Sequence, residues 1–241
     1  MTAVEAKLFV RDPGAPVTAL GIPLALVLVF GLMPGATTPS ADFGGHAALP
    51  TLIAPMAVAT LIAMLAVMLF PAAVATYREK GVLKRLSASP IPPSRLLGAQ
   101  LLVNLGAAVV AILLVVGVGR IALGMALPES PGWFVIVVLL GALALFSVGA
   151  LIAALAPTNR AASATGAAVF FPMLALGGVW VPREQLPPVL QHLADVLPLG
   201  ATLGGLREAA AGHAPELLQA GSLAVTAVVC AAIAARAFRW V

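Results

Sequence analysis

Residues 96–119 read LLGAQLLVNLGAAVVAILLVVGVG and contain no Asp, Glu, Lys or Arg. A helix needs about 20 residues to cross a hydrocarbon core of about 30 Å, so this stretch is long enough to span a membrane. Its apolar run from residue 109 to 119 does not alternate with polar residues, as a strand of a transmembrane barrel would. The stretch therefore predicts a transmembrane helix and an all-α fold.

Five further intervals of the 241-residue chain are equally free of charge. The complete set is 13–41, 43–77, 96–119, 130–159, 161–182 and 217–235. Only 9% of the residues are charged, whereas about a quarter would be in a soluble domain, and the mean hydropathy is +1.09. We therefore expect one transmembrane domain over residues 1–241. Its six spans are expected at about 17–34, 50–75, 97–119, 133–156, 161–181 and 217–238.

The basic residues predict the orientation of these spans. Six spans place both termini on one side, together with the loop 76–96, while the loop 182–216 lies on the other side. The first side receives Lys7, Arg11, Arg78, Lys80, Lys84, Arg85, Arg95, Arg160, Arg236 and Arg239, and the other side Arg120, Arg183 and Arg207. Cations concentrate on the cytoplasmic side, so both termini are expected there, in a bacterial plasma membrane.

Two other interpretations of the charges are less favoured. A cleaved signal peptide would also place Lys7 and Arg11 before an apolar stretch, but that stretch is longer than the 7 to 15 residues of a signal core. The pI near 10.0 could indicate nucleic-acid binding, but the cations are spread over short loops beside the spans. Nucleic acid is therefore not expected as a partner.

Residues for catalysis, metal binding or proton transfer are not expected in this chain. The six intervals hold no ionisable Asp, Glu, Lys or Arg, which argues against a proton-coupled transporter. The histidines His46, His192 and His213 lack a second ligand or base at motif spacing, and Cys230 is the only cysteine. No lysine lies in a phosphate-binding loop, so the chain is expected to need energy from another source.

The segment YREKGVLKRLSASPIPPSRLLGAQLL, residues 77–102, holds five of the thirteen basic residues. Val82, Leu83 and Leu86 recur at helical spacing, after a Gly81 that can end the preceding helix. A short amphipathic helix on the cytoplasmic side is predicted. From the residues alone it is either a basic loop that orients the protein or a docking surface, and both readings remain open.

This segment resembles the cytoplasmic loop of ABC transporter permeases of the type-2 family, which export drugs, polysaccharides and lipids. The matching residues are Glu79, Lys80, Gly81, Leu83, Leu86, Pro90 and Arg95, while Val82 and Lys84 differ from the family pattern. The resemblance implies a coupling helix that docks on an ATP-hydrolysing subunit, which would bind the ATP and Mg. The residues it assigns to coupling are Arg78, Glu79, Lys80, Gly81, Leu83, Lys84, Arg85 and Leu86.

The outer segment 177–212 contains a second helical pattern. Leu186, Val189, Leu190, Leu193, Val196 and Leu197 fall on one face, with Gln191, His192 and Asp195 opposite. Pro187 and Pro188 are expected to start this helix and Pro198 to stop it, leaving it in the outer interface or dipping into the membrane. The segment resembles the outer re-entrant motif of the same permeases through Pro172, Gly178, Pro182, Pro187 and Pro198.

Residues 7–13, KLFVRDP, are similar to the basic elbow that precedes the first span in these permeases, although a simple basic anchor explains them nearly as well. The compact length most resembles a daunorubicin-resistance type of drug-export permease. The resemblance implies an ABC exporter subunit that works with a nucleotide-binding ATPase and a second permease copy in the lipid bilayer. Ala161, Ala164, Thr165 and Ala168 would permit close helix contact.

The substrate is expected to be drug-like, lipid or otherwise amphipathic, and Gln100, Asn104 and Ser147 are the scattered polar groups of the expected pathway. Two alternatives stay open. One is a permease for polysaccharide or glycolipid export, and the other is a membrane assembly or regulatory subunit without transport of its own.

Overall fold

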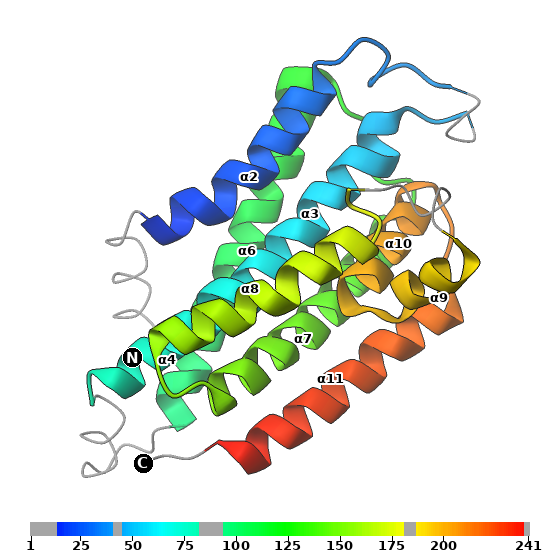
Figure 1. Cartoon of the computed structure of the whole chain (residues 1–241). Coiled ribbons are helices and arrows are strands. Elements are labelled where there is room, and N and C mark those ends of the chain that lie inside the picture. The colour runs from blue at the N-terminus through cyan, green and yellow to red at the C-terminus, as the bar shows by residue number, and fades with distance from the viewer. Residues whose placement is uncertain (1–13, 41–44, 82–93, 181–186, 239–241) are drawn as a thin grey trace.

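A computed structural model describes residues 14–40, 45–81, 94–180 and 187–238. Within these ranges the chain is helical, and the only β pairing is an isolated bridge between Pro39 and Ala47. The long helices lie side by side, and successive helices run in opposite directions (Figure 1). The described residues confirm the all-α class.

Four described helices are long and apolar enough to cross a membrane: the continuous helix Leu49–Glu79, α6 (Ser94–Leu123), α7 (Pro131–Leu155) and α11 (Leu217–Ala237). Each coincides with an expected span. The other two expected spans correspond to α2 (Gly14–Gly31) and α8 (Asn159–Leu176), which have 18 residues each. They run beside the long helices, and α8 begins with the polar pair Asn159 and Arg160.

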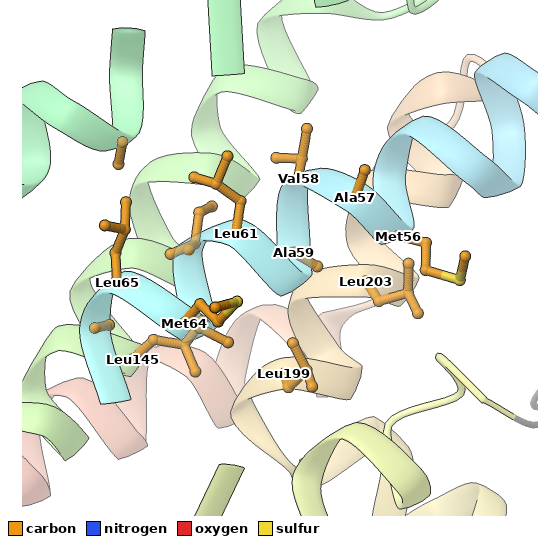
Figure 2. Packing of buried hydrophobic residues seen from close by; sticks show 14 of the residues in the cluster. Met56, Ala57, Val58, Ala59, Leu61, Met64, Leu65, Leu145, Leu199 and Leu203 are labelled. Atoms are coloured by element: carbon orange, nitrogen blue, oxygen red, sulfur yellow. The ribbon is translucent and has the colours of Figure 1, made fainter. Parts of the chain in front are cut away.

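Helix Leu49–Glu79 forms the centre of the bundle. It consists of η2 (Leu49–Ile53), α3 (Ala54–Ala63), η3 (Met64–Leu69) and α4 (Phe70–Glu79), and all ten residues of α3 are buried. Figure 2 shows Met56, Leu61 and Leu65 of this helix among Leu145 of α7 and Leu199 of α10 (Pro198–Ala210). A helix that is apolar all round can be covered by protein on every side without burying an unpaired polar group, which is compatible with its central place.

Two π-helical segments interrupt this central helix, η2 before Pro55 and η3 before Pro71. Proline has no N–H to donate to the carbonyl four residues earlier, so the regular α-helical bond is lost at each proline. A wider π turn accommodates the unmatched carbonyls. The prolines therefore account for the positions of both segments.

The second π segment is also where neighbouring helices approach the centre most closely. A Cβ atom built on Gly149 of α7 would lie 1.9 Å from the carbonyl oxygen of Ala66, and one on Gly166 of α8 would lie 2.6 Å from that of Val67. Only glycine leaves room for such backbone contact. These two glycines therefore allow α7 and α8 to pack directly against the backbone of η3.

The two ends of the bundle differ in structure. One end, called here the Glu79 end, holds the C-termini of α4, α7 and α11 and the N-termini of α6 and α8 (Figure 1). The opposite end, called the Glu129 end, holds the turns after α2 and α6 together with α9 (Pro188–Val196) and α10. Candidate functional residues lie at both ends.

Candidate coupling site

Helix α4 ends where the sequence predicts. Lys80 N–H donates to Thr76 O at 3.0 Å, Gly81 N–H donates to Arg78 O at 3.0 Å, and Gly81 has a φ of +65°. A positive φ is routine for glycine and unfavourable for other residues, so Gly81 turns the chain out of the helix. The expected role of Gly81 as a helix breaker is confirmed.

Arg78, in the last turn of α4, binds the end of α7. Its Nη1 donates to Ala153 O at 3.0 Å, in the last turn of α7, and to Ala156 O, in the residue that follows this helix. Carbonyls at a helix C-terminus need partners from outside the helix. The guanidinium carbon lies 5.2 Å from the centre of the Phe238 ring, immediately after α11. A cation at a helix C-terminus and over an aromatic face is favourable on both counts. Arg78 therefore joins the ends of α4, α7 and α11.

Glu79 binds the start of α8. Its Oε1 accepts the backbone N–H of Asn159 at 3.0 Å, and an acidic group is favoured at a helix N-terminus. The Asn159 amide returns to α4, donating to Thr76 Oγ1 at 2.6 Å and to Ala72 O at 3.0 Å. Consecutive residues of α4 thus hold both sides of the turn between α7 and α8.

The structure places the predicted coupling residues in three groups. Arg78 and Glu79 meet the α7–α8 turn, while Lys80 is exposed beside Gly81. Leu83, Lys84, Arg85 and Leu86 lie outside the described residues, as do the elbow at residues 7–13 and Pro182. Asn159 was not among the predicted site residues. Thr158 before it is a typical N-cap residue, whose Oγ1 accepts the N–H of Ala161, and this pattern is the signal that could have indicated the turn.

The predicted outer motif lies at the Glu129 end. Pro172 is inside α8, Gly178 has a φ of +83° just beyond it, and Pro187 precedes α9. Pro198 was expected to stop this helix and to belong to the outer motif. It follows the end of α9 at Val196, and it also opens the buried helix α10. Proline suits a first helical turn, where its missing N–H costs nothing.

The two faces of α9 lie opposite each other, as the sequence pattern predicts. That pattern places Asp195 opposite an apolar face in a helix expected in the outer interface or dipping into the membrane. In the structure Asp195 is only 3% exposed, whereas Val189 is 78% exposed. The helix turns its backbone and Asp195 toward α10 and α11, where Ser222 Oγ donates to Asp195 O at 3.3 Å. An outward apolar face is favourable when the surroundings are lipid.

Gln100 and Asn104, two of the polar groups expected along a pathway, lie where α6 meets α4. They are buried and interact with each other and with α4: Asn104 Nδ2 donates to Gln100 O at 2.9 Å, and Gln100 Nε2 to Tyr77 OH at 3.2 Å. Ser147 donates to Leu143 O of its own helix. Buried polar groups are normally satisfied in this way. The pair therefore fastens α6 to α4.

At the Glu129 end, three turns meet around Glu129 and Ser130. Glu129 Oε1 lies 3.3 Å from His46 Nδ1, and the Glu129 N–H donates to Ala210 O at 3.3 Å. Ser130 Oγ donates to Gly212 O at 3.0 Å. A cavity of about 250 Å³ lies beside this junction. In the described part of the chain no three His, Cys, Asp or Glu residues are grouped for a metal ion.

A comparison with known protein families shows which family this chain belongs to. The profile described as ABC-2 type transporter matches residues 1–210, which include the α4 end, the α7–α8 turn and the outer helices. The chain belongs to the ABC-2 type transporter family.

As an ABC-2 permease, the chain is a non-catalytic, multi-pass membrane subunit of a transporter that carries no cofactor of its own. Permeases of this family pair with nucleotide-binding subunits. The chain is also similar to Nodulation protein J of Neorhizobium galegae, with 37% identity over 95 residues. That match spans 39% of this chain and 36% of the length of that relative.

Proposed function

We propose that this ABC-2 permease is the transmembrane subunit of an exporter that moves a drug-like, lipid or other amphipathic substrate out across a bacterial plasma membrane. ATP hydrolysis in a separate nucleotide-binding subunit drives it. The observation that carries this proposal is the joint at the Glu79 end, where the segment predicted to dock on the ATPase is bonded directly to two further helices. A movement of α4 would therefore be transmitted directly to α7 and α8.

In this proposal the coupling region comprises Arg78 to Gly81 and the following residues Leu83 to Leu86. The bonds of Arg78 and Glu79 support it because they give the region a mechanical connection that a merely orienting basic loop does not need. Lys80 remains exposed beside the joint and is free to face a partner. The daunorubicin-resistance type of drug exporter is the subfamily proposed.

We also propose that α2 and α8 complete six spans and that the Glu79 end is cytoplasmic. The described cations support this orientation: Arg78, Lys80, Arg160 and Arg236 lie at the Glu79 end, and Arg120 and Arg207 at the other. Both termini and the loop 76–96 would then be inside and the loop 182–216 outside.

Cysteine labelling tests this orientation. In a Cys230→Ser background, His213→Cys is expected to react with a membrane-impermeant maleimide in intact cells, because the His213 side chain is 70% exposed at the Glu129 end. Lys80→Cys is expected to react only after the cells are opened. The reverse pattern would mean that the protein is inserted the other way round.

A second copy of the permease is part of the proposal. Ala164, Thr165 and Ala168 on α8 are exposed in the single chain, as is Phe171, which is 49% exposed. Ala161 instead packs inside the chain beside Ala162. A face of small residues lets two helices approach closely in a membrane. We therefore place the contact with the second copy, identical or related, on this side of α8.

The competing functions predict different partners. Export of a polysaccharide or glycolipid would need the same ATPase with a different substrate, whereas an assembly or regulatory subunit would need no ATPase. The partner ATPase therefore separates transport from the non-transporting role.

Copurification tests the exporter directly. The permease, expressed with the ATPase of its own operon or genome, is expected to copurify with it and to raise ATP turnover when an amphipathic substrate is added. The isolated permease is expected to bind no labelled ATP, because it has no phosphate-binding loop. A permease without any associated ATPase would support the regulatory alternative, and saturable ATP binding by the permease alone would refute the two-subunit arrangement.

A further inference from the structure

An apolar groove runs along α7 between α6 and α11. It has a volume of about 430 Å³. Its lining is aromatic and aliphatic, with Ser147 as its only polar side chain among the described residues, and that hydroxyl is already bonded to Leu143 O. The groove lies apart from α9, α10 and the exposed face of α8. It has no role in the function proposed above.

The length and position of the groove correspond to one leaflet of a bilayer. On α7 its lining extends from Ala142 to Ala153, a rise of about 16 Å at 1.5 Å per residue. Half of a hydrocarbon core of about 30 Å is nearly the same length. Because Ala153 is in the last turn of α7, the groove covers the half of the helix nearest the Glu79 end.

A positive charge lies at the end of the groove. Ala153 and Phe238 both line it and both contact Arg78, the first through its carbonyl oxygen and the second through its ring. Nη2 of Arg78 is buried and has no hydrogen-bond partner within the described ranges. The nearby carboxylate of Glu79 already accepts the N–H of Asn159. Arg78 does not line the groove itself, but it contacts two residues that do, so a cation lies just beyond one end of this apolar channel.

We propose that the groove binds one acyl chain of an anionic phospholipid from the inner leaflet, with its phosphate at the Arg78 end. An arginine binds phosphate through several donors, and basic sites between helices at the cytoplasmic surface suit anionic headgroups. The bound lipid would fill the space between α6 and α11, with its phosphate close to the positive charge of Arg78. This inference relies on the proposed orientation for the choice of leaflet.

The test compares two neighbouring alanines of α11. Both Ala231 and Ala232 are exposed, but only Ala231 lines the groove. Native mass spectrometry of the purified full chain in detergent would count bound phosphatidylglycerol and phosphatidylcholine. Phosphatidylglycerol is expected to bind about tenfold more tightly, through the charge-assisted contact to arginine. Ala231→Phe should fill the groove and lower this binding about tenfold, whereas Ala232→Phe should bind lipid like the unchanged protein.

Further measurements identify the headgroup contact. Arg78→Gln should remove the preference for phosphatidylglycerol, and Arg78→Lys should retain part of it because the charge remains. Equal binding of both lipids, unchanged binding in Ala231→Phe, or displacement of the lipid by millimolar inorganic phosphate would each overturn the proposal. Binding in detergent requires neither the ATPase nor a membrane side, so such a failure would leave the exporter proposal intact.

Discussion

Glu79→Arg is expected to abolish substrate-stimulated ATP turnover while the amount of permease in the membrane stays normal. The variant removes the acceptor of the Asn159 N–H and places a cation at the start of α8, which is electrostatically unfavourable. If Glu79 also pairs with a charge on the ATPase, its loss would weaken the docking free energy by about 2 to 5 kcal/mol, the cost of breaking a buried charge pair. Insertion should survive because the added cation strengthens the bias toward a cytoplasmic loop.

Glu79→Gln separates the two causes. Glutamine keeps an oxygen that can accept the Asn159 N–H, so α8 should start normally, but the docking charge is lost. We expect turnover in reconstituted vesicles to fall in Glu79→Gln as well, though less than in Glu79→Arg. Arg236→Glu reverses an exposed charge at the same end of the bundle and serves as the control. Normal turnover in both Glu79 variants would leave the loop with an orienting role only.

The φ of +65° at Gly81 allows a second, independent test of whether the end of α4 couples the permease to the ATPase. A β-branched residue resists this conformation, whereas asparagine tolerates it better than most residues. Gly81→Val should therefore redirect the chain that leaves α4 and uncouple ATP turnover. Gly81→Asn should keep much of it. Equal turnover in the two variants would show that the direction of this turn is unimportant.

Among the substitutions proposed here, Gly149→Ala is expected to cause the largest loss of folded protein. The new Cβ would lie 1.9 Å from Ala66 O, a backbone atom of the central helix that no side-chain rotation can move. Overpacking costs typically about 1 to 3 kcal/mol and occasionally more, and here α7 and η3 must separate along their contact. We expect a markedly lower thermal unfolding temperature and little monodisperse protein in size-exclusion chromatography.

Gly117→Ala is the matched control for this substitution. Gly117 lies within α6, and a Cβ there would meet nothing within 4 Å. Alanine is the better helix former by about 1 kcal/mol, so this variant should be as stable as the unchanged protein or more stable. If Gly149→Ala unfolds at the same temperature as Gly117→Ala, the close approach at Ala66 does not limit stability.

The helices of this permease were largely predictable because charge is so costly in a hydrocarbon core. The charge-free interval 96–119, for example, anticipates α6 at Ser94–Leu123. The end of α4 was predictable for a similarly local reason, since Gly81 permits a backbone conformation that other residues resist.

Features that depend on distant partners were not predictable from local patterns. The bonds of Arg78 to Ala153 and of Glu79 to Asn159 join residues more than seventy positions apart, and no local pattern connects them. The inward direction of Asp195 depends on α10 and α11, not on the spacing within α9. Buried glycines such as Gly149 looked like ordinary small residues of an apolar helix until their neighbours were known.

The enclosure of α10 has a consequence for biosynthesis. Ten of its thirteen residues are buried, and Leu223 of α11 packs with Ala144 and Ala201 to cover it. The ribosome makes α11 after α10, so a nascent chain must hold α10 in a partly covered state until Leu217–Ala237 has entered the bilayer. Proteases that remove unassembled membrane proteins are therefore expected to degrade a chain stopped after Ala210 and to spare one that includes α11.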